Sequence, residues 1–456
     1  MHRLPFLLAI LTSAAAQAQG APGDGFQVER YAVALRPDLA STAVNGTQTI
    51  DLRATVDRVT RLAFSPNALR ISDATADGTP LAVASGKDAI VFALPKALRK
   101  GARITLRFRI AGTPARGVTA LPGGVYSGYF ACDWMVCLQD VPGDKAHLLL
   151  DLHVPAGLRT LGNGRAQPPE VMPDGLVRHR WRTTRPYSPY LYAFAAGRFA
   201  RRVTRTPHGE LLLLDATGEP ADSTALFAQT SAAARFFAGK AGVPLPNGRY
   251  AQLLVPGHEA QEAAGFSLVG SAEIARERDD PGSEWLIAHE LAHQWWGNLV
   301  TCATWRDFWL NEGIVTFMVA AWKQQERGEA AYQRELETAR QRLVRAREEG
   351  FDKPLAWGGN YPSLRTRRAV QYGKGALFLA HLRATIGDAP FWAGLRDYTR
   401  RHAGGTVVSR DFQTAMERAS RRDLSAMFAD WVYGGVPPRE SAAGLSGCRF
   451  GHKESS

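Results

Sequence analysis

A pentapeptide and one glutamate that follows it constrain this chain of 456 residues more than any other part of its sequence. The pentapeptide, HELAH, runs from His289 to His293, and Glu312 follows after eighteen further residues. If one helix carries the pentapeptide, both imidazoles project from the same face, one turn apart. A carboxylate from a second helix would add a third ligand and leave one tetrahedral position open for water. This arrangement is typical of a catalytic zinc site.

The residues around the pentapeptide favour a helix. Asp280 and Pro281 supply an N-cap side chain and a proline for the first helical position, and we expect the helix to end at Gly297. The alternative is that His289 and His293 are ordinary side chains on a buried helix. That alternative requires the capping signals and the later glutamate to be accidental.

Glu290 lies between the two histidines, so it would point toward whatever the metal binds opposite its protein ligands. A carboxylate in that position can take the proton from an attacking water and return it to a leaving amine. The pentapeptide therefore predicts Glu290 as the general base of an amide hydrolysis.

The first eighteen residues are typical of a secretory signal peptide. His2 and Arg3 precede an apolar run over residues 4–11, and small residues follow, so we expect cleavage after Ala18 and a secreted or periplasmic protein. The apolar run is too short to span a bilayer, and no later stretch approaches eighteen uncharged apolar residues. We therefore expect no integral membrane segment after signal removal.

The net charge of +12 raises the possibility of a nucleic-acid partner. The arginines are scattered along the chain, however, and form no basic stripe interleaved with aromatic residues. We interpret the charge as a solvated basic surface and expect no nucleic-acid binding. The sequence does not indicate the oligomeric state.

The four cysteines exclude a disulfide-dense framework. Cys132 and Cys137 are close enough to pair in an oxidising compartment, whereas no spacing identifies a partner for Cys302 or Cys448. A Cys-x-x-Cys arrangement is absent from the sequence, which argues against a structural zinc site built from thiolates.

The chain changes from strand patterns to helix patterns near residues 205–222, which predicts an α+β protein of two domains. Alternation with period two is clearest at residues 104–110, and we expect an antiparallel β-sheet domain over residues 25–210. A mainly helical domain should occupy residues 211–438, with an irregular tail at 439–456. Further strands are predicted at 148–154, 190–195, 210–214, 251–255 and 267–270, and helices at 225–239, 330–349 and 376–386. The mixed charges of the second helix are interpreted as a solvated face.

Three segments resemble peptidase family M1, a family of zinc aminopeptidases of the gluzincin group with thermolysin-like catalytic domains. They are residues 295–301 (WWGNLVT), residues 309–313 (WLNEG) and residues 372–377 (YGKGAL). The resemblance implies one zinc ion held by His289, His293 and Glu312, and peptide substrates. It also implies that Tyr372 donates a hydrogen bond to the tetrahedral oxyanion, as such chemistry requires.

The family's exopeptidase motif, Gly-x-Met-Glu-Asn, is largely lost here, since residues 259–263 read EAQEA. By the resemblance, Glu262 corresponds to the glutamate that binds the free α-amino group of the substrate, and Glu259 is a competing candidate. A carboxylate that faces an ammonium group explains how an aminopeptidase selects the end of a chain.

The sequence therefore predicts a zinc metallopeptidase that most closely resembles an aminopeptidase. Because the exopeptidase motif is altered, an endopeptidase or oligopeptidase without a free N-terminus requirement remains a second interpretation. A third is a non-catalytic peptide-binding protein that retains a structural zinc. The family's large C-terminal helical domain is not found after residue 438, which implies a more open cleft.

Overall fold

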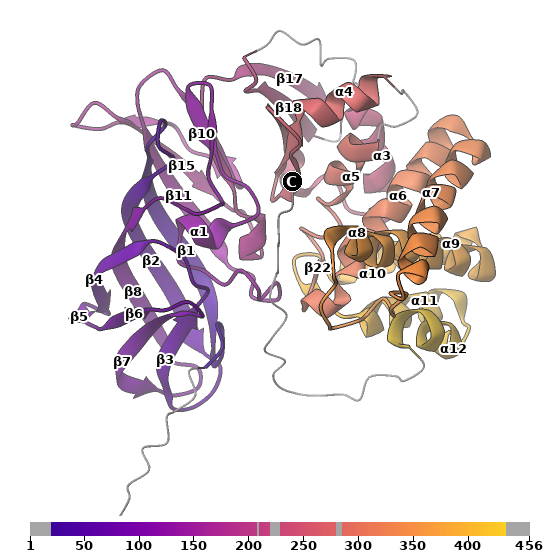
Figure 1. The fold of residues 1–456 in the computed structure, drawn as a ribbon, viewed down its shortest axis with the longest axis horizontal. Helices are drawn as coiled ribbons and strands as arrows, with labels where there is room; N and C mark the ends of the chain where they lie inside the picture. Colours follow the sequence, from indigo (N-terminus) through magenta and orange to yellow (C-terminus); the bar gives the residue numbers. More distant parts are fainter. Residues whose placement is uncertain (1–19, 208, 219–228, 280–284, 435–456) are drawn as a thin grey trace, which may run out of the picture.

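The structure is a computed structural model, and it describes residues 20–207, 209–218, 229–279 and 285–434. A half rich in strands and a half rich in helices lie side by side (Figure 1). The predicted order of a β-sheet domain followed by a mainly helical domain is confirmed. The predicted signal peptide, the cap at residues 280–281, Cys448 and the tail at 439–456 lie outside the described residues.

A large sheet of nine strands forms the body of the β domain. The order of the sheet is β13-β15-β11-β1-β2-β8-β4-β5, and β14 pairs with β15. The strands are β1 (Phe26–Pro37), β2 (Val44–Ala54), β4 (Arg70–Ala76), β5 (Thr79–Pro80), β8 (Arg103–Gly112), β11 (His147–Val154), β13 (Arg165–Ala166), β14 (Glu170–Val171) and β15 (Val177–Arg182). The sheet is antiparallel except between β1 and β11, which pair in parallel.

Burial explains why the period-two signal at residues 104–110 was reliable. Ile104, Leu106, Phe108 and Ile110 face the core of the β domain, whereas the side chains between them are exposed or half-buried. One face of β8 is thus buried and the other faces solvent. The predicted strands at 104–110 and 148–154 are found as β8 and β11.

Two smaller sheets complete the β domain. One contains β3 (Val59–Phe64), β6 (Val83–Ser85) and β7 (Ile90–Leu98), and the other contains β9 (Thr119–Leu121), β10 (Gly124–Tyr126), β12 (Arg159–Gly162) and β16 (Phe194–Gly197). The predicted strand at 190–195 is wrong in its first part, because Pro189–Leu191 forms a 3-10 turn. This run is apolar because it is buried throughout, and the proline at its start favours a helical turn.

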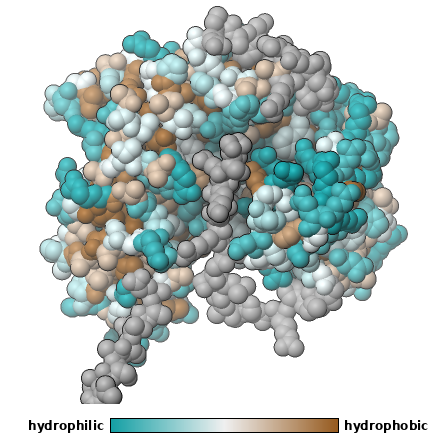
Figure 2. Space-filling view, viewed as in Figure 1, coloured by the Kyte–Doolittle hydropathy of each residue, from teal (hydrophilic) through white to brown (hydrophobic). Residues whose placement is uncertain are grey.

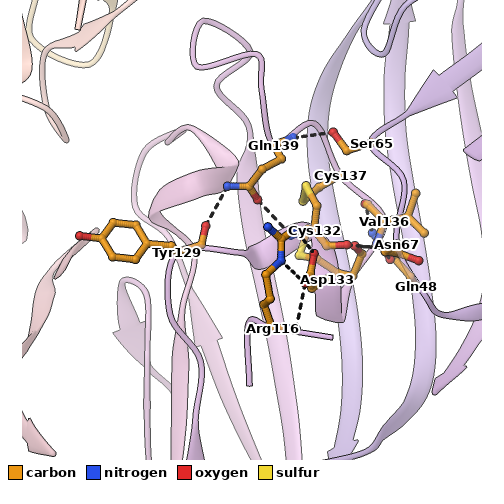
Figure 3. The surroundings of a disulfide bond; sticks show 11 residues. Gln48, Ser65, Asn67, Arg116, Tyr129, Cys132, Asp133, Val136, Cys137 and Gln139 are labelled. Atoms are coloured by element: carbon orange, nitrogen blue, oxygen red, sulfur yellow. Dashed lines mark hydrogen bonds and ion pairs between the residues drawn. A yellow bond between two sulfur atoms is a disulfide. The ribbon is translucent and has the colours of Figure 1, made fainter. Parts of the chain in front are cut away.

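A disulfide joins Cys132, within the one-turn helix α1 (Ala131–Trp134), to Cys137 in the interior of the β domain (Figure 3). The two cysteines that the sequence placed close enough to pair are therefore bonded. Cys302 is a free, buried thiol.

A fourth sheet, of five strands, lies next to the helices. Its order is β17-β18-β19-β21-β20, which leaves β20 at an edge. The strands are β17 (Ala200–Thr206), β18 (Gly209–Asp215), β19 (Arg249–Val255), β20 (Ala260–Ala263) and β21 (Phe266–Gly270), and they contain the predicted strands at 210–214, 251–255 and 267–270. The predicted domain boundary at residues 210–211 falls within β18.

Helix α6 (Trp309–Arg327) lies at the centre of the helical domain and is buried over most of its length. The helices around it include α3 (Thr230–Ala241), α4 (Ser271–Asp279), α5 (Trp285–Ala292), α7 (Glu329–Glu348), α8 (Leu364–Arg367), the π-helical segment η4 (Arg368–Lys374), α9 (Gly375–Ile386), α10 (Asp388–Arg401) and α11 (Ser409–Ser420). The helices predicted at 225–239, 330–349 and 376–386 correspond to α3, α7 and α9.

Helix α5 ends at Ala292, five residues before the predicted end at Gly297, and turns connect the two positions. In the described ranges, no helix combines the length and the apolar character needed to cross a membrane.

Candidate active site

Three buried side chains from α5, the turn after it, and α6 converge on one point. The Nε2 atoms of His289 and His293 lie 3.1 Å apart, and Glu312 Oε2 lies 3.3 Å from the first and 3.4 Å from the second. The edge of a tetrahedron is about 1.6 times its centre-to-corner distance, so zinc ligands at ~2.0–2.1 Å from the metal stand about 3.3 Å apart. The three atoms are therefore spaced for one zinc ion.

The turn that follows the pentapeptide fixes the tautomer of His293. The Nδ1 atom of His293 lies 3.1 Å from the carbonyl oxygen of Trp296. In the neutral ring, Nδ1–H therefore donates to this carbonyl oxygen, and the Nε2 lone pair stays available for a metal. A Cβ atom at Gly297 would stand 2.8 Å from this Nδ1, and the backbone of Gly297 has a φ of +120°. Glycine is thus required at 297 for the ring and the turn to coexist.

His289 stacks with two aromatic rings. Its ring centroid lies 4.1 Å from that of Trp285 and 5.9 Å from that of Tyr372, whose ring is nearly parallel to it, with an interplanar angle of 6°. Because an imidazole can bind a metal only when its ring points correctly, this stacking would orient His289 for a metal. Trp285 was not predicted as a site residue, although its position four residues before His289 was a signal.

The electrostatics of the cluster favour a cation. Burial raises the pKa of Glu312, but the two neighbouring histidines outweigh it and hold that pKa well below the usual range. Burial would lower the pKa of His293, yet the carboxylates of Glu312 and Glu262 raise it to about 10. For His289, burial dominates and lowers the pKa to about 4. The site therefore keeps a buried carboxylate charged and demands positive charge beside it.

Glu290 is buried beside the ligand cluster and is not part of it. Its Oε2 atom has no hydrogen-bond partner within the described ranges. One oxygen of Glu290, one oxygen of Glu262 and a ring nitrogen of His293 lie within 4.8 Å of one another. Burial raises the pKa of Glu290 well above its usual range, so this carboxylate binds a proton more readily than a solvated glutamate does.

Glu262 reaches the same place from the edge strand β20. The carbonyl oxygen of the next residue, Ala263, accepts hydrogen bonds from Gln294 Nε2 at 3.2 Å and from Asn298 Nδ2 at 3.0 Å. The amide side chains that follow the pentapeptide thus fix β20 against the metal ligands. Burial raises the pKa of Glu262 to about 7.

The competing candidate, Glu259, lies elsewhere. Its Oε1 atom accepts a hydrogen bond of 2.8 Å from the hydroxyl of Tyr126, and Glu259 is not among the residues that line the cleft. The structure therefore brings Glu262, and not Glu259, to the other predicted site residues.

Tyr372 lies in the π-helical segment η4, which packs against α6. Burial and the charge of Glu312 raise the pKa of Tyr372 well above the usual range, so the hydroxyl keeps its proton and remains a donor.

All six predicted site residues line one cleft of about 730 Å³: Glu262, His289, Glu290, His293, Glu312 and Tyr372.

Tyr129 of the β domain also lines this cleft, which no local sequence signal indicated. Its hydroxyl donates to the carbonyl oxygen of Ala260 at 2.6 Å, and its backbone N–H donates to Gln261 Oε1 at 2.7 Å. Gln139, two residues after the disulfide, donates to the carbonyl oxygen of Tyr129 at 2.7 Å (Figure 3). The loop held by the disulfide thus supports the side of the cleft on which Glu262 lies.

Residues 228–431 match the family model described as "Peptidase family M1 domain". Probable aminopeptidase 1 of Saccharolobus solfataricus is 26% identical over 321 residues, which are 67% of this chain and 40% of that protein. Aminopeptidase N of Lactococcus lactis subsp. lactis is 29% identical over 265 residues, which are 55% of this chain and 31% of that protein. The chain thus spans less than half the length of these curated relatives.

The fold is similar to that of a solved structure, an M1 zinc metallopeptidase from Deinococcus radiodurans. The TM-score is 0.76 at 24% sequence identity, and the match covers 92% of this chain and 97% of that one. The predicted resemblance to the family is confirmed by the family model, and the structural match confirms the fold.

Proposed function

We propose that this chain, whose helical domain is a peptidase family M1 domain, is a zinc-dependent aminopeptidase that releases N-terminal residues from peptides. One observation carries the proposal: a cluster spaced for zinc lies in the same cleft as two further buried carboxylates, Glu290 and Glu262. A closed structural site would give these two side chains no task. We expect one zinc ion per chain.

Zinc held by His289, His293 and Glu312 would lower the pKa of a bound water and polarise a carbonyl oxygen. Glu290 acts as the general base: its free Oε2 atom takes a proton from the attacking water and passes it to the nitrogen of the leaving amine. The C–N bond breaks as that nitrogen gains the proton, so the carboxylate returns to its starting state.

Tyr372 supplies the hydroxyl that faces the developing negative charge on the carbonyl oxygen. It is suited to the role because its ring lies parallel to that of His289, which places it beside the metal ligands. A donor that is oriented before the reaction stabilises the transition state without reorganising.

Glu262 selects the end of the chain. Its carboxylate lies close to Glu290 and His293, so an ammonium group that pairs with it sits beside the reacting carbonyl. A substrate whose amine is acetylated cannot make this ion pair. The result is release of one residue at a time from a free N-terminus.

The rate on a free tripeptide, compared with the rate on its N-acetylated form, tests the end selection. We expect the free peptide to be hydrolysed at least about a hundredfold faster in kcat/KM, because a buried charge left unpaired is costly. In the Glu262→Gln variant this preference should shrink, while in the matched Glu259→Gln control it should be retained. Equal rates on both peptides in the native protein would favour the endopeptidase or oligopeptidase interpretation.

The leader is a separate proposal. We propose that residues 1–18 direct export and are removed after Ala18, which would place the mature protein in the periplasm or outside the cell. N-terminal sequencing of the protein recovered from those fractions should begin at Gln19.

A further inference from the structure

One wall of the cleft carries four arginines that form no ion pair with a carboxylate of the described ranges. Arg342 and Arg345 come from α7, Arg365 comes from α8, and Arg368 comes from η4. None of the four guanidinium groups forms an ion pair or a hydrogen bond with a described residue. Among the described residues of α7 and the turn after it, Glu349 is the one carboxylate that lines this wall. It accepts a hydrogen bond of 3.4 Å from the hydroxyl of Thr366.

The other side of α7 differs from this wall. Arg340 pairs with Glu337 at 3.1 Å, and Arg347 pairs with Asp352 at 2.6 Å. Glu335, a neighbour of Arg342, is bound to Lys323 Nζ at 2.6 Å. Figure 2 shows hydrophilic residues gathered over the part of the surface where Figure 1 shows α7. The helix was predicted to be a solvated charged face, yet the part that lines the cleft carries an excess of positive charge.

These arginines also act on one another. Burial lowers the pKa of Arg342, the positive charges of Arg368 and Arg345 lower it further, and the charge of Glu335 opposes them. Arg368 lines the same cleft as His289 and Glu290. A bound anion would relieve this repulsion.

The opposite wall of the cleft is acidic. Glu262 lies on β20, and Glu273 and Glu277 lie on α4, on the other side of α5 from α8 (Figure 1). The cleft therefore has a negative side, where the amine binds, and a positive side. A short peptide in solution has the same polarity, with an ammonium group at one end and a carboxylate at the other.

We propose that Arg342, Arg345, Arg365 and Arg368 bind a carboxylate on the C-terminal side of the scissile bond, so that the substrates are short or acidic peptides. The inference rests on the proposed aminopeptidase function, because a peptide with its amine at Glu262 and its first carbonyl at the metal ligands must run away from Glu262. The carboxylate is either the α-carboxylate of a peptide of a few residues or an acidic side chain. Guanidinium groups bind either one through paired hydrogen bonds.

Two pairs of peptides test the proposal and separate the two sources of the carboxylate. Ala-Ala-Ala with a free C-terminus is compared with its C-terminal amide, and Ala-Ala-Glu amide is compared with Ala-Ala-Gln amide. We expect the charged member of at least one pair to be hydrolysed roughly tenfold faster in kcat/KM, and the ratio to fall as salt is added. The pair that shows the effect identifies the source.

The variant R342Q/R345Q should bring that ratio close to one. The control variant R334Q/R340Q removes the same charge from the same helix outside the cleft, and it should keep the ratio of the native protein. Because each ratio is taken within one protein, a general loss of activity cancels. Melting temperatures of both variants report folding separately.

The outcomes distinguish this inference from the proposed function. Hydrolysis of all four peptides at equal rates, or a ratio that persists in R342Q/R345Q, would overturn the role of the arginines while the aminopeptidase survives. No hydrolysis of any free peptide by the zinc-loaded protein would overturn the proposed function itself.

Discussion

Gly313 and Gly375 lie in direct contact, since a Cβ atom on Gly313 would stand 2.9 Å from the Cα atom of Gly375. This contact joins α6 to the start of α9, next to the π-helical segment η4. One residue before Gly313 is Glu312, and three residues before Gly375 is Tyr372. The two glycines therefore set the distance between a metal ligand and the proposed oxyanion donor.

Replacing Gly313 by alanine should push these two elements apart. We expect Gly313→Ala to destabilise the protein by ~1–3 kcal/mol, as overpacking of a core does, and to lower kcat more than it raises KM. Calorimetry and steady-state kinetics measure the two effects.

Gly239→Ala is the matched control for this substitution. Gly239 also lies in a helix, α3, but a Cβ atom there meets nothing within 4 Å. Alanine should stabilise that helix by about 0.5–1 kcal/mol and leave the kinetics unchanged. If both variants behave alike, the glycine contact does not govern the site.

Replacing Glu290 by glutamine should separate metal binding from turnover. The amide keeps the shape of the side chain but cannot accept the proton of the water, so we expect kcat to fall by roughly 10²–10⁴. Zinc content, measured by elemental analysis, should stay at the native level because Glu290 is not one of the converging ligands. Unchanged turnover would show that another group is the base.

Removal of zinc should cost both activity and stability. The three ligands join α5 to α6, so a metal that binds only the folded state adds about 2.7 kcal/mol when its free concentration is a hundred times its dissociation constant. We expect a chelator to lower the melting temperature and abolish hydrolysis, and zinc to restore both. In Glu312→Gln, zinc should raise the melting temperature less; an equal rise would remove Glu312 from the ligand set.

Asp144 provides a test of stability against pH away from the metal site. It is buried, its Oδ1 accepts from the N–H of Val28 at 3.2 Å, and its Oδ2 has no described partner. Burial raises its pKa to about 7, whereas an unfolded aspartate titrates at about 3.9. The folded state therefore holds a proton that the unfolded state has lost, and this contribution to stability disappears as the pH rises through 7.

Asp144→Asn keeps the acceptor for Val28 and removes the buried charge. The variant should melt at a higher temperature than the native protein at pH 8 and at nearly the same temperature at pH 4. The difference between the two melting curves, measured at intervals from pH 4 to pH 8, checks the sign. A difference that does not grow with pH would contradict the buried-charge explanation.

Much of the site was predictable because its signals are local. The pentapeptide and the later glutamate encode the ligand cluster through helix geometry, and the structure brings His289, His293 and Glu312 to one point. The strand at 104–110 was predictable for the same reason, because alternation along β8 follows directly from one buried face.

The rest depends on contacts between distant segments. The run at 190–195 is apolar because it is buried on all sides, so its composition could not distinguish a strand from a turn. The sequence of α7 shows mixed charges but does not show which of its turns faces the cleft, so Arg342 and Arg345 were missed. Tyr129 was missed because Gln139 and β20 hold it in place, and no spacing in the sequence records such contacts.

Gln139, which follows the disulfide, holds Tyr129 against the cleft, so both halves of the protein contribute to the site. The three proposed metal ligands come from the helical half, whereas the strand that carries Glu262 is held by Tyr129 and Gln139 of the β half. The proposed chemistry and the proposed choice of substrate therefore depend on different parts of the chain. A change in the loop around the disulfide should alter peptide preference while the three proposed ligands stay in place.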